Sequence, residues 1–319
     1  MRDGRNLNEL LENRPMATSL QKCIHLGFCL IVLGAALSAH AKFETHTRVP
    51  FAEPEGETLR LTLWTPNNAE TKRPGLVMIH GGGWAMGTRT MMRSYGEAFA
   101  DAGYVVASIS YRMMPKYAFP SQLEDAKAAV RWMRLNAGQY GIDPDRIAVM
   151  GSSAGGQLAA LVATTTPEDG FEGTENLGPS SDVQAAIIIY GAVDLTDWEE
   201  RVEESKNKGF FRRKLGGFLE DFVSRDQKDV ENPFEAASPV TYVDENTAPM
   251  LFIHGSKDGM VSMDQPDTMV QRLAEAGVPV RFLVAEGQRH GFDHFSPTLR
   301  KRMIEEMLKF LDEFMPAER

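Results

Sequence analysis

A short apolar strand that runs into a glycine–serine turn is the most constraining feature of this sequence. Residues 147–150 (Ile-Ala-Val-Met) lead directly into Gly-x-Ser-x-Gly over 151–155, and a second apolar run follows over 158–162. A serine on a sharp turn between a strand and a helix keeps its hydroxyl exposed, and the flanking glycines let the chain pass closely. The pattern predicts a strand, a tight turn and a helix over about 154–163, with Ser153 as a candidate nucleophile.

The first 41 residues differ in character from the rest of the chain. An almost uncharged run over 23–37 follows Lys22 and precedes Ala39-His40-Ala41, the small-x-small pattern typical of a cleavage site. We therefore expect a signal peptide over 1–41, one domain over 42–319, and a secreted or periplasmic protein with no stable membrane span after cleavage. An uncleaved anchor is the alternative, because about 20 apolar residues can cross a bilayer.

Charge and cysteine content restrict the partners that we expect. The chain carries 34 Lys and Arg against 44 Asp and Glu, a formal net charge of −10, which disfavours binding to nucleic acid or to an anionic membrane surface. Both cysteines, Cys23 and Cys29, lie in the leader. The expected mature domain therefore has no disulfide and depends on its hydrophobic core, which a chain of this length can build.

Strands and helices are expected to alternate along the domain. Residues 58–64 alternate in polarity and predict an early antiparallel strand, whereas continuous apolar runs predict buried strands. Strands that alternate with helices of 10–16 residues indicate an α/β fold, with a mostly parallel sheet covered on both faces. The expected buried strands are 75–80, 104–110, 146–150, 183–190, 249–254 and 278–284, and the clearest helices are 121–136 and 299–314.

Residues 195–236 are too long for a simple connection between a helix and a strand. The stretch is charged, rich in phenylalanine and helical in character. Two interpretations stay open: a lid inserted near the mouth of the site, or an ordinary pair of surface helices.

A glycine loop follows the strand over 75–80. His80–Trp84 reads His-Gly-Gly-Gly-Trp, and three glycines leave backbone N–H groups free to point at a substrate oxygen. We expect an oxyanion hole formed by the amides of Gly82, Gly83 and Ala154, the residue after the serine. Trp84 is expected to border the substrate pocket, with a packed loop anchor as the alternative. A phosphate-binding turn is disfavoured, because no phosphate-loop pattern follows.

The base and the acid of a catalytic triad are sought at the carboxyl ends of other strands, where ligands bind in such folds. His290 lies after the strand over 278–284 and is favoured over His294, which falls near the last helix. Asp258 lies four residues after the strand over 249–254, and Asp194 is its rival. The expected order is serine, then Asp258, then His290, which is typical of α/β-hydrolases.

With these motifs the chain resembles the hormone-sensitive-lipase-like carboxylesterases of the α/β-hydrolase superfamily. Within that group it is most similar to bacterial secreted esterases related to feruloyl and acetylxylan esterases. The resemblance covers most of residues 43–315. It departs from many relatives at Ser152, where they carry an acid. Besides the glycine loop and the serine turn, the resemblance rests on Ser110-Tyr-Arg112, Phe119-Pro120, Asp125 and His290-Gly-Phe292.

The resemblance implies a serine esterase with no metal and no cofactor, acting on a small-molecule or carbohydrate ester. Such enzymes release acyl groups from small esters or from plant polysaccharides. Residues that match Tyr111 and Asp125 are structural in these relatives. Two alternatives stay open: an amide hydrolase similar to kynurenine formamidase, and a catalytically inactive α/β-hydrolase that serves as a binding module.

Overall fold

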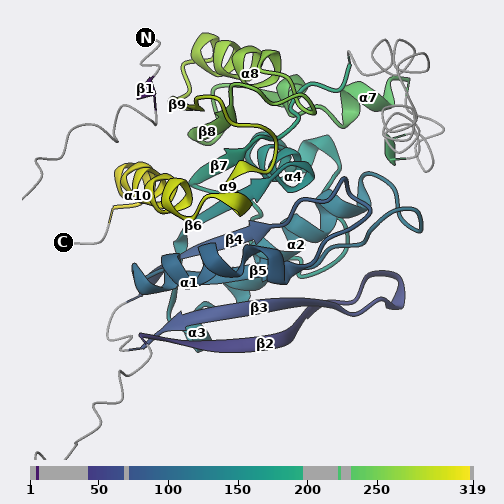
Figure 1. Cartoon of the computed structure of the whole chain (residues 1–319). Helices are drawn as coiled ribbons and strands as arrows, with labels where there is room; N and C mark the ends of the chain where they lie inside the picture. The colour runs from purple at the N-terminus through teal and green to yellow at the C-terminus, as the bar shows by residue number, and fades with distance from the viewer. Residues whose placement is uncertain (1–4, 7–41, 68–71, 197–221, 224–230, 317–319) are drawn as a thin grey trace, which may run out of the picture.

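A nine-stranded sheet organises the protein. The computed structural model describes residues 5–6, 42–67, 72–196, 222–223 and 231–316. The strand order is β1-β9-β8-β7-β6-β4-β5-β3-β2 (Figure 1). β4 to β9 pair in parallel throughout, while β3 runs antiparallel to both β2 and β5. The strands are β1 (Arg5–Asn6), β2 (Phe43–Ala52), β3 (Leu59–Pro66), β4 (Arg73–Ile79), β5 (Val105–Ile109), β6 (Ile142–Ser152), β7 (Ala185–Ile189), β8 (Met250–Gly255) and β9 (Val280–Ala285).

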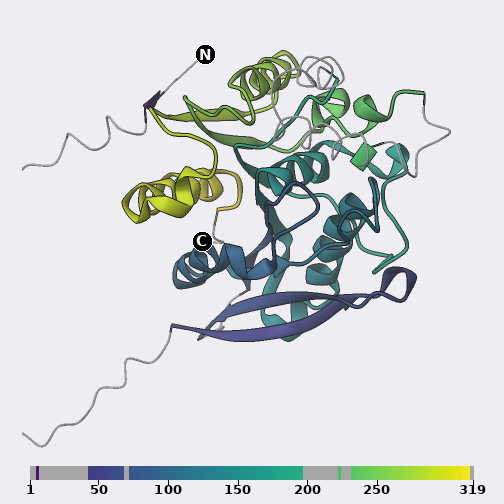
Figure 2. The same ribbon diagram turned by 45° about the vertical axis from the view of Figure 1, so that its right-hand side comes forward.

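Helices cover both faces of this sheet. One face packs against α2, α4 and α8, and the other packs against α1 and α10, as Figures 1 and 2 show from two directions. The predicted α/β class, the early antiparallel strand and the parallel strands are all confirmed. The α-helices are α1 (Arg93–Asp101), α2 (Ser121–Leu135), α3 (Ala137–Tyr140), α4 (Ala154–Thr164), α7 (Pro233–Ala236), α8 (Asp264–Glu275), α9 (Phe292–Phe295) and α10 (Pro297–Phe314).

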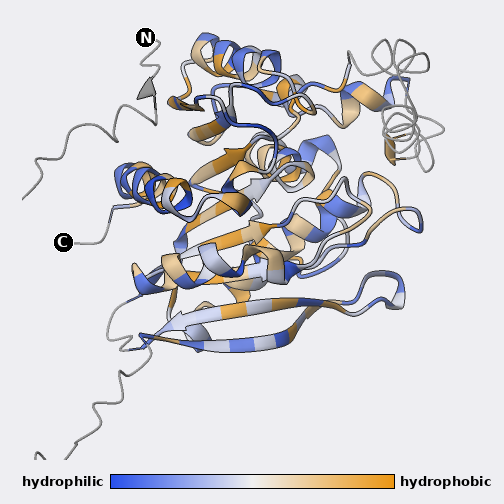
Figure 3. Ribbon diagram, viewed as in Figure 1, coloured by the Kyte–Doolittle hydropathy of each residue, from blue (hydrophilic) through white to orange (hydrophobic). Residues whose placement is uncertain are grey.

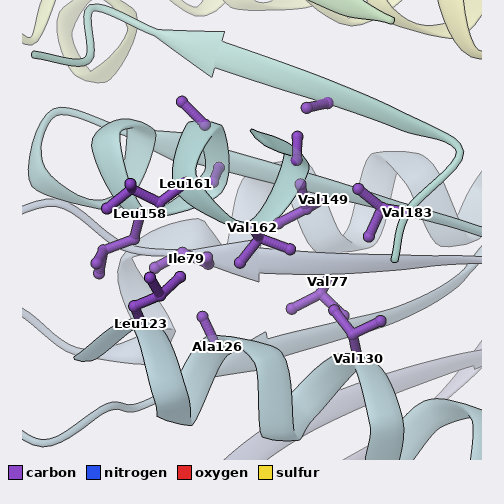
Figure 4. Packing of buried hydrophobic residues seen from close by; sticks show 14 of the residues in the cluster. Val77, Ile79, Leu123, Ala126, Val130, Val149, Leu158, Leu161, Val162 and Val183 are labelled. Atoms are coloured by element: carbon purple, nitrogen blue, oxygen red, sulfur yellow. The ribbon is translucent and has the colours of Figure 1, made fainter. Parts of the chain in front are cut away.

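Successive side chains of the central strands point to opposite faces of the sheet, so the core has two layers. Along β4, Val77 and Ile79 belong to the cluster under α2 and α4, whereas Leu76 and Met78 point to the cluster under α1 and α10. Both faces are buried, so the strand sequence is apolar throughout, and Figure 3 shows the central strands mostly in orange. Figure 4 shows the first layer, where Val77 and Ile79 meet side chains of α2 and α4.

The edge strand β2 is a feature that the sequence pattern does not indicate. It pairs antiparallel with β3, but the register shifts between His46 and Val49 and again between Pro50 and Ala52. Each shift breaks the alternation of period two by which a half-buried strand is recognised.

Most of the predicted insertion over 195–236 lies outside the described residues. Within it, Phe222 and Val223 are buried, and the short helix α7 lies close to its end. β1 lies within the predicted signal peptide and pairs with β9. In the described part of the chain, no helix combines the length and the apolar character needed to cross a membrane.

Candidate active site

Ser153 lies at the tight turn between β6 and α4. Its backbone has φ 54° and ψ −123°, a strained conformation for a residue with a side chain. The Ser153 amide donates to the carbonyl of Ile189 at the end of β7, at 2.9 Å, which holds the turn against the next strand. Close packing of Gly155 on the carbonyl of Ile79 fixes the other side. The predicted turn, with its strand and helix, is present at the carboxyl edge of the sheet.

His290 bridges Ser153 and Asp258. Its Nε2 lies 2.9 Å from Ser153 Oγ, and its Nδ1 lies 2.7 Å from Asp258 Oδ2. The structure thus brings together three predicted residues from the ends of β6, β8 and β9. The rival residues are not part of this chain of contacts: His294 is exposed, and Asp194 Oδ1 accepts hydrogen bonds from Thr196.

Asp258 is held by more groups than the sequence suggests. Its Oδ1 accepts the amides of Met260 at 2.9 Å and Val261 at 3.0 Å, and His254 Nε2 lies 3.4 Å from Oδ2. Burial by itself raises the pKa of the Asp258 carboxyl, but the hydrogen bonds from His254, His290 and the Val261 amide hold that pKa well below its usual range. The carboxylate therefore stays charged beside the imidazole.

The buried His254 is a residue whose place the sequence does not reveal. Its Nε2 lies 2.9 Å from the carbonyl oxygen of Val261, so it closes the turn that carries Asp258. In sequence it ends a buried strand, which by itself predicts only a strand terminus. The i, i+4 spacing between His254 and Asp258 is the one local signal of their contact.

The glycine loop passes directly beside the serine. A Cβ built on Gly81 would lie 3.1 Å from Ser153 Cβ, and Gly82 and Gly83 have φ values of 126° and 58°. The carbonyl of Gly82 accepts the amides of Ala85 and Met86. Positive φ at Gly82 and Gly83 is accessible to glycine at little cost, whereas at Gly81 the close approach of Ser152 and Ser153 leaves no room for a side chain.

Trp84, the last residue of this loop, is almost wholly buried. Its Nε1 donates to Oε1 of Gln157 in α4 at 3.0 Å, and its ring stacks on Phe222 with centroids 4.2 Å apart. Gln157 in turn donates to the carbonyl of Ala237 at 2.7 Å. These contacts anchor the loop to α4, and contact between Trp84 and a substrate stays a prediction.

The described residues contain no candidate set of metal ligands. No three His, Cys, Asp or Glu side chains in this part of the chain gather so that they could hold a metal ion. The side chains that the structure brings together at this site are those of Ser153, His290 and Asp258.

Comparison with known proteins assigns the family. A family model described as BD-FAE matches residues 61–273. The chain belongs to the BD-FAE family. It is 34% identical over 278 residues to esterase LipQ of Mycobacterium tuberculosis, covering 84% of this chain and 62% of LipQ. It is 33% identical to esterase LipC of the same organism, covering 80% of this chain and 61% of LipC.

Solved structures of esterases have folds similar to that of this BD-FAE member. A truncated carbohydrate esterase from gut microbiota aligns with a TM-score of 0.71 at 24% identity, over 86% of this chain and 98% of that one. Apo esterase 2 of Thermogutta terrifontis aligns with a TM-score of 0.70 at 24% identity, over 87% and 97%. The fold is the α/β-hydrolase fold, as predicted. The chain spans about three fifths of the length of LipQ and LipC.

Proposed function

We propose that this protein is a serine carboxylesterase that works through an acyl-enzyme. The observation that carries the proposal is the continuous chain from Ser153 Oγ through the His290 ring to Asp258, with contacts of 2.9 and 2.7 Å. A serine hydroxyl becomes a useful nucleophile when an adjacent base takes its proton and a carboxylate orients that base. The two Mycobacterium tuberculosis relatives named above are esterases, which supports an ester as the substrate.

In the proposed reaction, Ser153 Oγ forms a bond to the ester carbonyl carbon while its proton passes to His290 Nε2. The bond to the leaving oxygen then breaks, and His290 gives the proton to the departing alcohol. Water attacks the resulting acyl-serine by the same route, and the acid leaves. Asp258 keeps the imidazole in the orientation and tautomer that this requires and stabilises its charged form.

The developing oxyanion is proposed to bind the amides of Gly82, Gly83 and Ala154. Ala154 begins α4, and the amides of the first turn of a helix have no partner within the helix and favour negative charge. The close approach of Gly81 to Ser153 supports the choice of the two following amides as the other donors. Preorganised donors of this kind typically contribute about 10²–10³ in kcat each.

For the substrate we propose small acyl or aryl esters, including acetyl and feruloyl groups carried by plant polysaccharides. The similarity to a carbohydrate esterase of gut microbiota supports the carbohydrate side of this proposal. An arylesterase of Saccharolobus solfataricus, 29% identical over 68% of this chain, supports the aryl side. Rates on acetyl, butyryl, octanoyl and feruloyl esters, with an N-formyl amide alongside, test it. A preference for the N-formyl amide would favour the amide-hydrolase alternative.

Replacing the serine tests the mechanism. Ser153→Ala in the full chain is expected to lower the hydrolysis of p-nitrophenyl acetate by at least about 10⁴-fold and to abolish labelling by a fluorophosphonate probe. Ser180→Ala, at an exposed loop serine, is the matched control and should keep both properties. Unchanged hydrolysis in Ser153→Ala would overturn the proposal, and absence of labelling in the wild type would favour a binding module.

We also propose export with cleavage after Ala41, on the strength of the apolar run and the small-x-small pattern. Mass spectrometry of the protein recovered from the periplasm or medium should find an N-terminus at Lys42. Protein that retains residues 1–41 in the membrane fraction would contradict the proposal.

A further inference from the structure

Asp293 is a buried carboxylate that the triad does not use. It lies in α9, three residues after His290, and its side chain is 1% exposed. Its Oδ2 accepts the hydroxyl of Tyr95 in α1 at 2.9 Å, and its Oδ1 accepts the hydroxyl of Tyr190. Arg300 in α10 donates to its backbone carbonyl at 2.8 Å. Asp293 therefore ties the loop that carries His290 to three other elements.

Both tyrosines are suited to act as permanent donors to this carboxylate. Burial raises the pKa of Tyr95 and of Tyr190 well above the usual value, and the negative charge of Asp293 raises each pKa further. The phenols thus stay protonated at neutral pH. A buried carboxylate that accepts two such hydrogen bonds has its polar atoms satisfied.

Tyr190 connects this buried group to the site. Its ring lies against the His290 ring, with centroids 4.6 Å apart and planes 57° from each other. Its amide donates to Ile253 in β8 at 2.9 Å, and the preceding residue, Ile189, accepts the Ser153 amide. Tyr190 is therefore fixed between the strands that carry the nucleophile and the acid, with its side chain packed on the base.

The backbone of Tyr190 is strained. Its φ of 39° lies in the left-handed region, which is a true outlier for a bulky side chain. Such a conformation persists only where the surrounding structure imposes it, and it is found most often at functional sites. The amide bond to Ile253, the hydrogen bond to Asp293 and the ring contacts with His290 and Phe292 hold it here.

We propose that Tyr190 and Asp293 are a positioning pair that sets the ring of His290 between Ser153 and Asp258. The proposal rests on the proposed function, in which His290 is the base. Two hydrogen bonds hold the ends of the imidazole, but the ring can still tilt about the line that joins its nitrogens. Tyr190 supports one side of the ring, and Asp293 fixes both Tyr190 and the loop on which His290 lies.

Tyr190→Phe and Asp293→Asn, made in the full chain, test the pair. Each is expected to lower kcat on p-nitrophenyl acetate by about 10- to 100-fold, because a small misplacement of a catalytic group has a large effect on rate. KM should stay within about twofold of the wild-type value, since no substrate contact is removed. The rate of fluorophosphonate labelling should fall in parallel with kcat. The double variant should lose little more than the worse single variant, because the two side chains act on His290 through the contact between them.

Tyr104→Phe is the matched control. Tyr104 is buried in the same hydrophobic cluster, and the nearby charge of Asp312 adds to the burial that raises its pKa, which makes it a second buried tyrosine beside an aspartate. It should lose thermal stability to an extent similar to Tyr190→Phe while keeping wild-type kcat. If Asp293→Asn fails to fold, Tyr95→Phe replaces it, since it removes the other hydrogen bond to Asp293 and should lower kcat by a smaller factor.

Three results would overturn the proposal. They are wild-type kcat in the Tyr190 and Asp293 variants, a loss that lies in KM alone, and an equal loss of kcat in Tyr104→Phe. Ser153→Ala, measured alongside, distinguishes failure of the positioning proposal from failure of the proposed function. If Ser153→Ala is inactive while Tyr190→Phe is fully active, the positioning role is rejected and the esterase mechanism stands. If Ser153→Ala is active, the esterase mechanism itself is rejected.

Discussion

Gly151 packs against Gly155 so closely that a Cβ on Gly151 would overlap the Gly155 carbonyl group. This contact brings the end of β6 and the first turn of α4 together around Ser153. Gly151→Ala has to push the helix away from the strand, and we expect it to lower the free energy of unfolding by at least about 1–3 kcal/mol. Urea unfolding measures the loss, and hydrolysis of p-nitrophenyl acetate should fall with it.

Gly138→Ala is the control for this prediction. Gly138 lies in α3, and a Cβ there would meet nothing within 4 Å. Alanine is the better helix former by about 1 kcal/mol, so this variant should match or exceed the wild type in stability. Equal losses in the two variants would contradict the role given to the Gly151–Gly155 contact.

The low pKa of Asp258 predicts a stability difference that depends on pH. The pKa of this carboxyl is lower in the folded protein than in the unfolded chain, where it is about 3.9. The ionised carboxyl therefore stabilises the fold at any pH above the unfolded pKa, and this contribution is lost as the pH falls toward the folded pKa. Asp258→Asn should therefore be less stable than the wild type at pH 7, and the gap should narrow below about pH 4. Urea unfolding of both proteins at pH 7 and pH 3 checks this.

Asp145→Asn provides the comparison, because Asp145 is exposed at the surface. Its stability difference from the wild type should be small at both pH values. If the stability difference between the wild type and Asp258→Asn grew toward pH 3, the predicted direction of the pH dependence would be wrong.

Much of the candidate site follows from the sequence because of how parallel sheets are built. Ser153, Asp258 and His290 each come shortly after an apolar strand, and parallel strands end at one edge of the sheet. Local pattern therefore places residues that lie more than 100 positions apart, as Ser153 and His290 do, within reach of each other. The glycine loop is found by the same reasoning.

Tyr190 and Asp293 could not be found in that way. They are 103 positions apart, and neither carries a local motif. In sequence, the tyrosine reads as the end of a buried strand and the aspartate as a polar residue before a helix. Their importance comes from a tertiary contact in the interior and from the backbone conformation of Tyr190, which no periodicity reports. β2 could not be predicted for another reason, because its register shifts interrupt the alternation of polar and apolar residues.

Arg112 is predicted to be essential for stability. It is buried, its Nε donates to Asp125 Oδ1 at 2.9 Å, and its guanidinium also reaches Glu55 and Glu124 at 2.8 Å. Asp125 is 1% exposed, so Arg112→Leu leaves a buried carboxyl without its ion-pair partner. We expect a loss of about 3–5 kcal/mol in the free energy of unfolding, measured by urea titration.

Arg93→Ala is the comparison for Arg112→Leu. Arg93 forms an exposed i, i+4 ion pair with Glu97 in α1. Such pairs contribute only about 0.3–0.5 kcal/mol, so this variant should stay close to the wild type. A loss in Arg112→Leu as small as that in Arg93→Ala would show that the buried carboxylate does not need its partner.

The two glycines proposed for the oxyanion hole should respond differently to alanine. At Gly82, φ is 126°, which is open to glycine, and a Cβ would overlap the carbonyl group of Met86. Gly82→Ala therefore has to move the loop and its N–H groups, and kcat should fall by about 10²–10³ with KM little changed. At Gly83, φ is 58° and a Cβ would meet nothing within 4 Å, so the change adds only about 1–2 kcal/mol of backbone strain.

Gly83→Ala should consequently retain far more activity than Gly82→Ala. Gly170→Ala controls for left-handed strain alone, because Gly170 has φ 80°, open space at Cβ and a position at the end of the short 3₁₀ helix Pro167–Asp169. It should lower stability and leave kcat unchanged. Equal losses of kcat at positions 82 and 83 would mean that strain, and not displacement of the loop amides, governs the rate. The comparison of kcat and KM on p-nitrophenyl acetate across the three variants decides between these causes.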